Sequence, residues 1–135
     1  MAYVAASIEI PTDPDSIWAV IGPFGSIGEW LPGFGKAELR DGGRVRRLQS
    51  EDGGIFLERL VTYDEPGRSC SYTITQAPVE IADHLAVIRV HAVGNGRSSR
   101  VDWTAAFTVN GNAHEITKMI QGLFDDGLIA LKSKF

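Results

Sequence analysis

The chain has a single cysteine among its 135 residues, so Cys70 has no partner for an internal disulfide. It lies in a strand-like run, where a small core residue in a reducing compartment is the simplest interpretation. No uninterrupted apolar stretch approaches the roughly 18 residues of a membrane-spanning helix, and residues 1–10 lack the basic and apolar regions of a secretory signal. We therefore expect a cytoplasmic protein without a membrane span.

Basic residues are also scarce, because 13 Lys and Arg against 17 Asp and Glu give a formal net charge of −4. They are scattered except at Arg44, Arg46 and Arg47, which excludes the electrostatic footprint of a nucleic-acid-binding protein. The chain has no Gly-x-Ser-x-Gly elbow, and Gly94-Asn95-Gly96 is a tight turn, not a phosphate-binding loop. The histidines and Cys70 show no metal-ligand spacing. We expect no metal and no cofactor.

Turn residues recur about every 8 to 12 residues between Lys36 and Val109, which is typical of an antiparallel meander. The predicted strands are 3–10, 37–40, 45–49, 55–63, 70–76, 84–92 and 99–109. Two short helical pieces follow the first strand: one is capped by Thr12 or Asp13 with Pro14 at its first position, and the other covers 26–30.

Residues 113–132 carry apolar side chains three or four apart, which predicts one long amphipathic helix begun by Asn112. A helix with a wide apolar stripe has to bury it, so we expect a long antiparallel sheet to curl around this helix. The prediction is one α+β domain covering residues 1–135. Gly122 and Gly127 lower helix propensity, and either close approach of the sheet or open volume for a ligand would explain them.

A series of short motifs follows in order along nearly the whole chain. They are Ile8-Glu9-Ile10, Pro14, Ile17-Trp18, Phe24-Gly25, Glu29-Trp30, Pro32-Gly33, Arg46-Arg47, Glu58-Arg59, Tyr72, Val101-Asp102-Trp103, Gly127-Leu128 and Leu131. Their order resembles the polyketide cyclase/dehydrase family of the START-like superfamily, which is also named after the birch pollen allergen. The resemblance implies a helix-grip fold, in which a seven-stranded sheet wraps around the C-terminal helix and the two short helices close a cavity. It implies small-molecule binding more firmly than any reaction.

Large aromatic and apolar residues are the candidates for the cavity wall, although core packing would explain them equally. The candidate ligand-binding residues are Trp30, Phe34, Tyr72, His84, Trp103, Leu123 and Phe124. His84 alternates with apolar residues of its strand and is expected to point inward, either as a hydrogen-bonded core residue or as a ligand contact. It stands where members of the family often have a tyrosine.

Arg46 and Glu58 lie in strands that the turn at Asp52-Gly53-Gly54 would join, so a matching register would make them a cross-strand ion pair. On the outer face this pair would contribute little, whereas in the cavity Glu58 could orient a carbonyl or act as a general base. Two apolar sets compete in this strand: Ile55, Leu57, Val61 and Tyr63 against Phe56 and Leu60. If the first set faces the core, Glu58 points outward, and if the second set does, Glu58 points inward. Alternation therefore does not decide the face of Glu58.

Three functions therefore remain. The leading hypothesis is a domain that binds a small apolar or aromatic molecule between the sheet and the last helix. The alternative is a cyclase, aromatase or dehydratase acting on a poly-carbonyl substrate, with Glu58 or His84 as base and Arg46 or Tyr72 polarising an oxygen. The third is an interaction module, such as a homodimer joined through a sheet edge.

Overall fold

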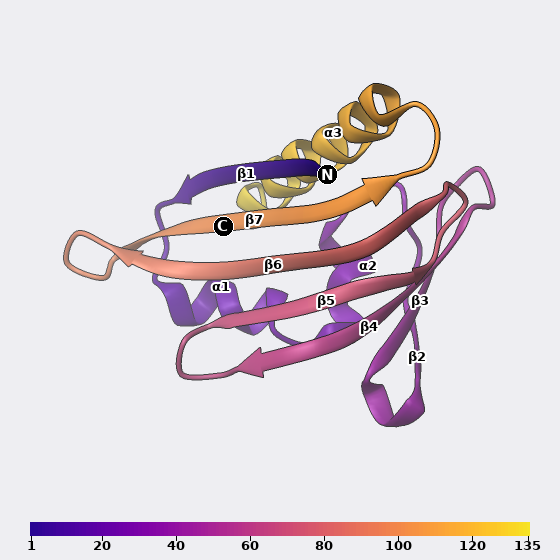
Figure 1. Cartoon of the computed structure of the whole chain (residues 1–135). Helices are drawn as coiled ribbons and strands as arrows, with labels where there is room; N and C mark the ends of the chain where they lie inside the picture. Colours follow the sequence, from indigo (N-terminus) through magenta and orange to yellow (C-terminus); the bar gives the residue numbers. More distant parts are fainter.

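The computed structural model describes all 135 residues as a curved, seven-stranded antiparallel sheet around one long helix (Figure 1). The strands are β1 (Ala2–Ile10), β2 (Glu38–Arg40), β3 (Val45–Gln49), β4 (Ile55–Asp64), β5 (Ser69–Gln76), β6 (Ile81–Val93) and β7 (Ser98–Val109). Their order in the sheet is β1-β7-β6-β5-β4-β3-β2. Every pair of neighbours except β1 and β7 is therefore consecutive in the chain, which confirms the predicted meander.

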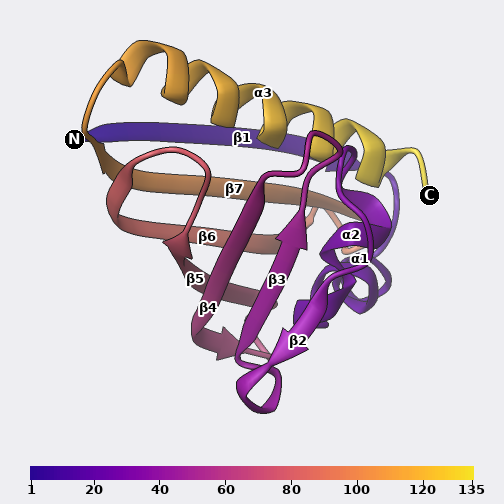
Figure 2. The same cartoon turned by 90° about the vertical axis from the view of Figure 1, so that its right-hand side faces the viewer.

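The first and the last helix begin where the sequence places their caps. The helical elements are α1 (Pro14–Ile21), a 3₁₀ turn η1 (Phe24–Ser26), α2 (Ile27–Trp30), a 3₁₀ turn η2 (Asp41–Gly43) and α3 (Ala113–Lys132). Asp13 accepts the Ser16 backbone N–H at 3.0 Å, and Asn112 accepts that of Glu115 at 3.2 Å. The short helices α1 and α2 lie at one end of the concave side of the sheet, beside the C-terminal half of α3 (Figure 2). None of the helices combines the length and apolar character needed to cross a membrane.

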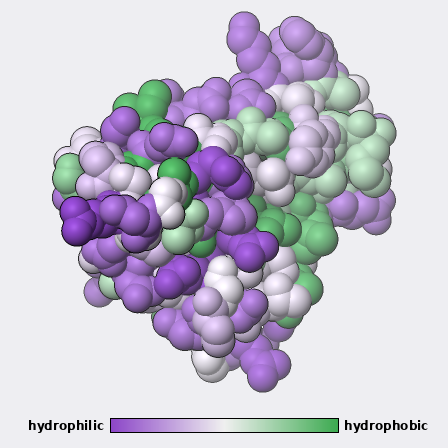
Figure 3. Space-filling model, turned by 90° about the vertical axis from the view of Figure 1, so that its left-hand side faces the viewer, coloured by the Kyte–Doolittle hydropathy of each residue, from purple (hydrophilic) through white to green (hydrophobic).

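The main core lies between α3 and the concave face of the sheet. Val101, Trp103, Ala105 and Phe107 of β7 all point inward and are fully buried, as their alternation predicts. The Trp103 ring stacks on Phe124 of α3, with 3.8 Å between ring centroids and 8° between the planes. The end of the molecule seen in Figure 3 is mostly hydrophilic, with smaller hydrophobic areas between. Most large apolar side chains are thus used inside the fold.

An extra residue in β4 explains why alternation left the face of Glu58 open. Leu60 pairs with Tyr72 and Thr62 pairs with Ser71, so Val61 is the additional residue of a β-bulge. The inward residues before the bulge are Phe56, Glu58 and Leu60. After the bulge the parity changes, and Tyr63 packs against Trp18 of α1 with 5.6 Å between ring centroids. Both apolar sets therefore contain inward residues, and Glu58 faces the interior.

Two element boundaries differ from the sequence prediction by more than one residue. The strand predicted over 84–92 begins earlier, at Ile81, because an irregularity between Ala82 and Leu85 carries the pairing past Asp83. Asp83 has a φ of +50°, a conformation that aspartate tolerates better than most residues. The helical piece predicted over 26–30 is split into η1 and α2, and it starts at Phe24.

The two glycines of α3 have opposite surroundings: Gly127 is closely approached, and Gly122 borders open space. A Cβ on Gly127 would lie 2.7 Å from Leu31 Cδ1 and 3.2 Å from Trp103 Cζ3, which shows close approach. A Cβ on Gly122 would meet nothing within 4 Å, because this residue borders an open groove.

This contrast predicts opposite effects of one substitution. Gly122→Ala should raise the free energy of unfolding by about 0.5–1 kcal/mol, because alanine favours the helix and finds free space. Gly127→Ala should lower it by about 1–2 kcal/mol, because overpacking against Leu31 and Trp103 outweighs the same gain in propensity. Urea unfolding of both variants measures the two values. A stabilised Gly127→Ala would contradict the close approach.

Candidate functional site

An enclosed cavity of about 40 Å³ lies between the concave face of the sheet and α3. Its lining residues are Ile27, Leu31, Phe34, Leu48, Phe56, Glu58, Tyr72, Ile74, Val79, Ile81, His84, Trp103, Met119, Ile120, Leu123 and Phe124. The wall is apolar except for Glu58, His84 and the Tyr72 hydroxyl. The volume corresponds to roughly one or two water molecules, so a larger molecule would have to displace side chains.

Six of the seven candidate ligand-binding residues line this cavity: Phe34, Tyr72, His84, Trp103, Leu123 and Phe124. Trp30 does not line it. The Trp30 ring instead packs on Trp103 with 5.4 Å between centroids, next to a separate small void. The remaining apolar wall residues were not among the candidates predicted from the sequence. Two of them could have been found from their spacing. Phe56 alternates with Glu58 in β4, and Met119 precedes Leu123 by one helical turn in α3.

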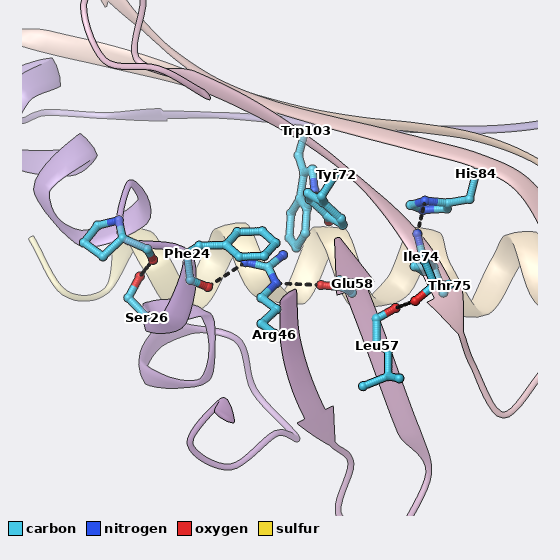
Figure 4. A network of polar contacts seen from close by, with 11 residues as sticks. Phe24, Ser26, Arg46, Leu57, Glu58, Tyr72, Ile74, Thr75, His84 and Trp103 are labelled. Atoms are coloured by element: carbon cyan, nitrogen blue, oxygen red, sulfur yellow. Dashed lines mark hydrogen bonds and ion pairs between the residues drawn. The ribbon is translucent and has the colours of Figure 1, made fainter. Parts of the chain in front are cut away.

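Arg46 and Glu58 form an ion pair inside the protein, at directly opposite positions of β3 and β4. Arg46 Nε lies 2.8 Å from Glu58 Oε1, and the two residues are only 5% and 6% exposed. The guanidinium Nη1 donates a hydrogen bond of 3.1 Å to the Phe24 carbonyl, which connects the pair to η1 (Figure 4). The register matches, which is the condition that the sequence set for a cross-strand ion pair.

Two aromatic rings complete the surroundings of Arg46. The guanidinium carbon lies 4.1 Å from the centroid of the Phe24 ring and 4.6 Å from that of Tyr72. Cation–π contacts of this kind help to offset the desolvation of a buried guanidinium. Arg46 therefore fixes Glu58 through Oε1, while Glu58 Oε2 forms no hydrogen bond within the chain and belongs to the cavity wall.

His84 is held as a neutral side chain at the other end of the cavity (Figure 4). Its Nδ1 accepts the Ile74 backbone N–H at 3.0 Å, and the residue is 6% exposed. Burial lowers the pKa of His84 to about 4. At neutral pH the ring proton is therefore on Nε2. This N–H has no acceptor within the chain, so His84 can donate a hydrogen bond but does not act as a base.

Tyr72 lies between these groups and remains a phenol. Its hydroxyl accepts a hydrogen bond of 3.0 Å from Trp103 Nε1. Burial raises the pKa of Tyr72, and the nearby Glu58 charge raises it further. The hydroxyl proton has no acceptor within the chain. The cavity thus offers one carboxylate oxygen as acceptor and two donors, the Tyr72 O–H and the His84 Nε2–H.

An open groove of about 870 Å³ adjoins the cavity. Its walls are Pro32, Gly33, Phe34, Ser50, Glu51, Asp52, Phe56, Pro78, Glu115, Lys118, Met119, Gly122, Leu123 and Asp126. In Figure 2 the turn between β3 and β4 is seen in front of α3, and residues of both line the groove. The cavity and the groove share four residues: Phe34, Phe56, Met119 and Leu123. We call these four residues the gate, because they separate the enclosed space from the open one.

The donor set of the cavity is not that of a metal centre. No group of three His, Cys, Asp or Glu side chains lies close enough together to hold a metal ion. Cys70 is buried, and burial raises the pKa of its thiol, so it stays protonated at neutral pH. The site is therefore a small apolar chamber with three polar groups.

Solved structures share this architecture over their whole length. The protein XoxI from Bacillus cereus is 35% identical, with a TM-score of 0.95 over 100% of this chain and 96% of that chain. A START superfamily protein from Mycobacterium smegmatis is 14% identical, with a TM-score of 0.79 over 99% and 97% of the two chains. The Zhui aromatase/cyclase from Streptomyces sp. R1128 is 15% identical, with a TM-score of 0.78 over 98% and 92%. The last two share the fold alone, and they confirm the expected helix-grip architecture.

One family model matches the whole chain. No curated protein matches the chain significantly. The family model described as polyketide cyclase/dehydrase and lipid transport matches residues 1–135. That match covers every element that builds the cavity, from the short helices to α3. The chain therefore belongs to the polyketide cyclase/dehydrase and lipid transport family.

Proposed function

We propose that this protein binds a small, mainly apolar molecule that carries a hydroxyl or carbonyl oxygen in the cavity between the sheet and α3. One observation carries the proposal: Glu58 Oε2, the Tyr72 O–H and the His84 Nε2–H lie in one apolar cavity without partners in the chain. A ligand hydroxyl can accept from the Tyr72 and His84 donors and donate to Glu58 Oε2, whereas a ligand carbonyl oxygen can accept from the two donors only.

The size of the cavity indicates that binding opens the gate. An aromatic ring does not fit into about 40 Å³, whereas the adjoining groove has ample space. Met119 is half exposed and unbranched, so it can move at small energetic cost. Apolar burial at roughly 25 cal/mol per Å² would drive binding, and the three polar groups would set the orientation of the ligand.

A substitution in the gate tests the proposal. Leu123→Trp should fill the entrance and abolish ligand binding. Ile129→Trp should leave ligand binding unchanged, because Ile129 lies elsewhere on α3 and is 62% exposed. Protein purified from its own host is analysed by native mass spectrometry, and any released molecule is identified after denaturation.

Thermal-shift screening of phenols and aryl ketones complements this measurement. A molecule bound at one per chain to the native protein and to Ile129→Trp, but not to Leu123→Trp, supports the proposal. Absence of both a bound molecule and any thermal stabilisation would reject it.

The free carboxylate oxygen also favours a second function, acid–base chemistry on a carbonyl substrate. Glu58 is the candidate base, because Arg46 holds its other oxygen and His84 Nδ1 already accepts a backbone proton. The Tyr72 and His84 donors would polarise the substrate oxygen, while Arg46 lies behind Glu58 and does not line the cavity. Incubating the identified molecule with the protein and following its mass and spectrum tests this function. If the molecule stays unchanged, the catalytic function is rejected and only the binding function remains.

A further inference from the structure

The polar groups of the cavity stand on three neighbouring strands of the concave face. Glu58 of β4 is paired with Ile74 of β5, and the Ile74 backbone N–H donates to His84 Nδ1 of β6 at 3.0 Å. Tyr72 lies two residues before Ile74, so its side chain is on the same face of β5. The carboxylate and the two donors therefore border one enclosed space from different strands.

Glu58 presents a fixed acceptor to this space. The residue is 6% exposed, and Arg46 Nε occupies its Oε1 at 2.8 Å. Arg46 is itself held by the rings of Phe24 and Tyr72, and it does not line the cavity. Oε2 is therefore the oxygen left for an occupant of the cavity. Because a buried charged acceptor without a donor is unfavourable, the occupant should supply a hydrogen-bond donor.

The two donors of the cavity are oriented by the chain in the same way. Trp103 Nε1 donates to the Tyr72 hydroxyl oxygen at 3.0 Å, which leaves the hydroxyl proton for another acceptor. His84 Nδ1 accepts a backbone proton, which leaves the ring proton on Nε2. Both protons need an acceptor, so the occupant should supply lone pairs as well as a donor.

We propose that the ligand is an alcohol or a phenol, whose neutral hydroxyl donates to Glu58 Oε2 and whose lone pairs accept from Tyr72 and His84. The inference rests on the proposed function and narrows its ligand to one chemical class. A ketone or an ether has lone pairs but no proton, so it leaves Oε2 unpaired. An ammonium group has protons but no lone pair, and a carboxylate would be repelled by Glu58.

Four probes with similar skeletons test this inference: 1-phenylethanol, acetophenone, isopropylbenzene and 1-phenylethylamine. They differ in whether the group beside the ring donates, accepts, does both or does neither. Each is titrated calorimetrically into the full chain at neutral pH. The alcohol should bind about tenfold more tightly than the ketone and the hydrocarbon, because it alone pairs Oε2 and the donors. The protonated amine should bind most weakly, because its charge would be buried in an apolar wall.

Glu58→Gln should reverse the preference between alcohol and ketone. Arg46 Nε is a donor, so it holds the amide oxygen of the glutamine, and the amide NH₂ then faces the cavity. The polar groups of the variant are all donors, and acetophenone should bind at least about threefold more tightly than 1-phenylethanol. Glu9→Gln is the matched control: it removes a carboxylate from the surface and should keep the native preference for the alcohol.

A second variant removes the carboxylate without leaving a buried charge. Arg46→Met combined with Glu58→Leu replaces the ion pair by apolar side chains, so it tests the inference even if Glu58→Gln does not fold. This double variant should bind the alcohol and the ketone with affinities within about twofold of each other. A preserved tenfold preference for the alcohol would show that Glu58 is not the acceptor, and would overturn the inference.

The outcomes distinguish this inference from the proposed function. Equal binding of the alcohol, the ketone and the hydrocarbon to the native protein would overturn the preference for a hydroxyl and leave apolar binding in place. Tighter binding of the ketone than of the alcohol would overturn it in the same way. If none of the four probes binds or stabilises the protein, both the inference and the proposed function fail.

Discussion

Replacing Arg46 by methionine is expected to lower the free energy of unfolding by about 3–5 kcal/mol. The side chain of methionine fits the same space, but Glu58 would remain buried without the guanidinium that lies 2.8 Å away. The Phe24 carbonyl would also lose its donor, which detaches η1 from β3. Urea unfolding at neutral pH measures the loss, and ligand binding should weaken with it because Glu58 is no longer held.

A double variant shows whether the loss comes from the unpaired charge. Arg46→Met combined with Glu58→Leu replaces the ion pair by apolar side chains of similar volume, and such replacements are often close to neutral. The double variant should therefore recover most of the stability. It should still bind ligand poorly, because the carboxylate oxygen in the cavity wall is gone. If Arg46→Met alone costs less than about 1 kcal/mol, Glu58 is not the uncompensated charge that the geometry implies.

Acidification is expected to destabilise the protein through His84 by up to about 3 kcal/mol between pH 6.5 and pH 4. Burial lowers the pKa of His84 in the folded protein to about 4, from 6.5 in the unfolded chain. Within this window the unfolded state binds more protons, so the free energy of unfolding rises with pH. The contribution of His84 is fully present above pH 6.5 and is lost as the pH falls towards 4.

Unfolding midpoints in urea between pH 4.5 and pH 7.5 measure this dependence. His84→Gln should flatten the profile, because glutamine occupies the site without a titrating group. His91→Gln is the matched control: His91 lies on the outer face, with Nε2 2.8 Å from Asp102. An equal flattening in both variants would show that His84 is not the buried neutral group responsible.

Local sequence signals predicted much of the fold. Pro14, Asp13 and Asn112 place the helix starts, since a cap and a fixed φ act within one turn of the chain. Glycine-containing turns place the strands, because the antiparallel sheet follows the order of its hairpins. The wide apolar stripe of α3 predicted that the sheet curls around it, and the resemblance to the family implied the same arrangement. The compartment and the single-domain organisation stay predictions.

Part of the candidate site was also within reach of the sequence. The inward faces of β6 and β7 follow a simple alternation, so His84 and Trp103 were placed in the cavity by period alone. The pairing of Arg46 with Glu58 follows from the length of the turn between them. Trp30 was a different case, because a large aromatic residue suits a core and a cavity wall equally well.

The order of the main helices and strands, and the inward residues of the regular strands, could be predicted from the sequence because they depend on neighbours along the chain. The face of Glu58, the surroundings of Gly122 and Gly127 and the volume of the cavity depend on contacts between distant segments, so they are seen only in the folded protein. The bulge at Val61 reverses alternation within one strand, and no single period describes it. The cavity depends on how closely α3 approaches the sheet, where shifts of about one ångström decide between contact and open space.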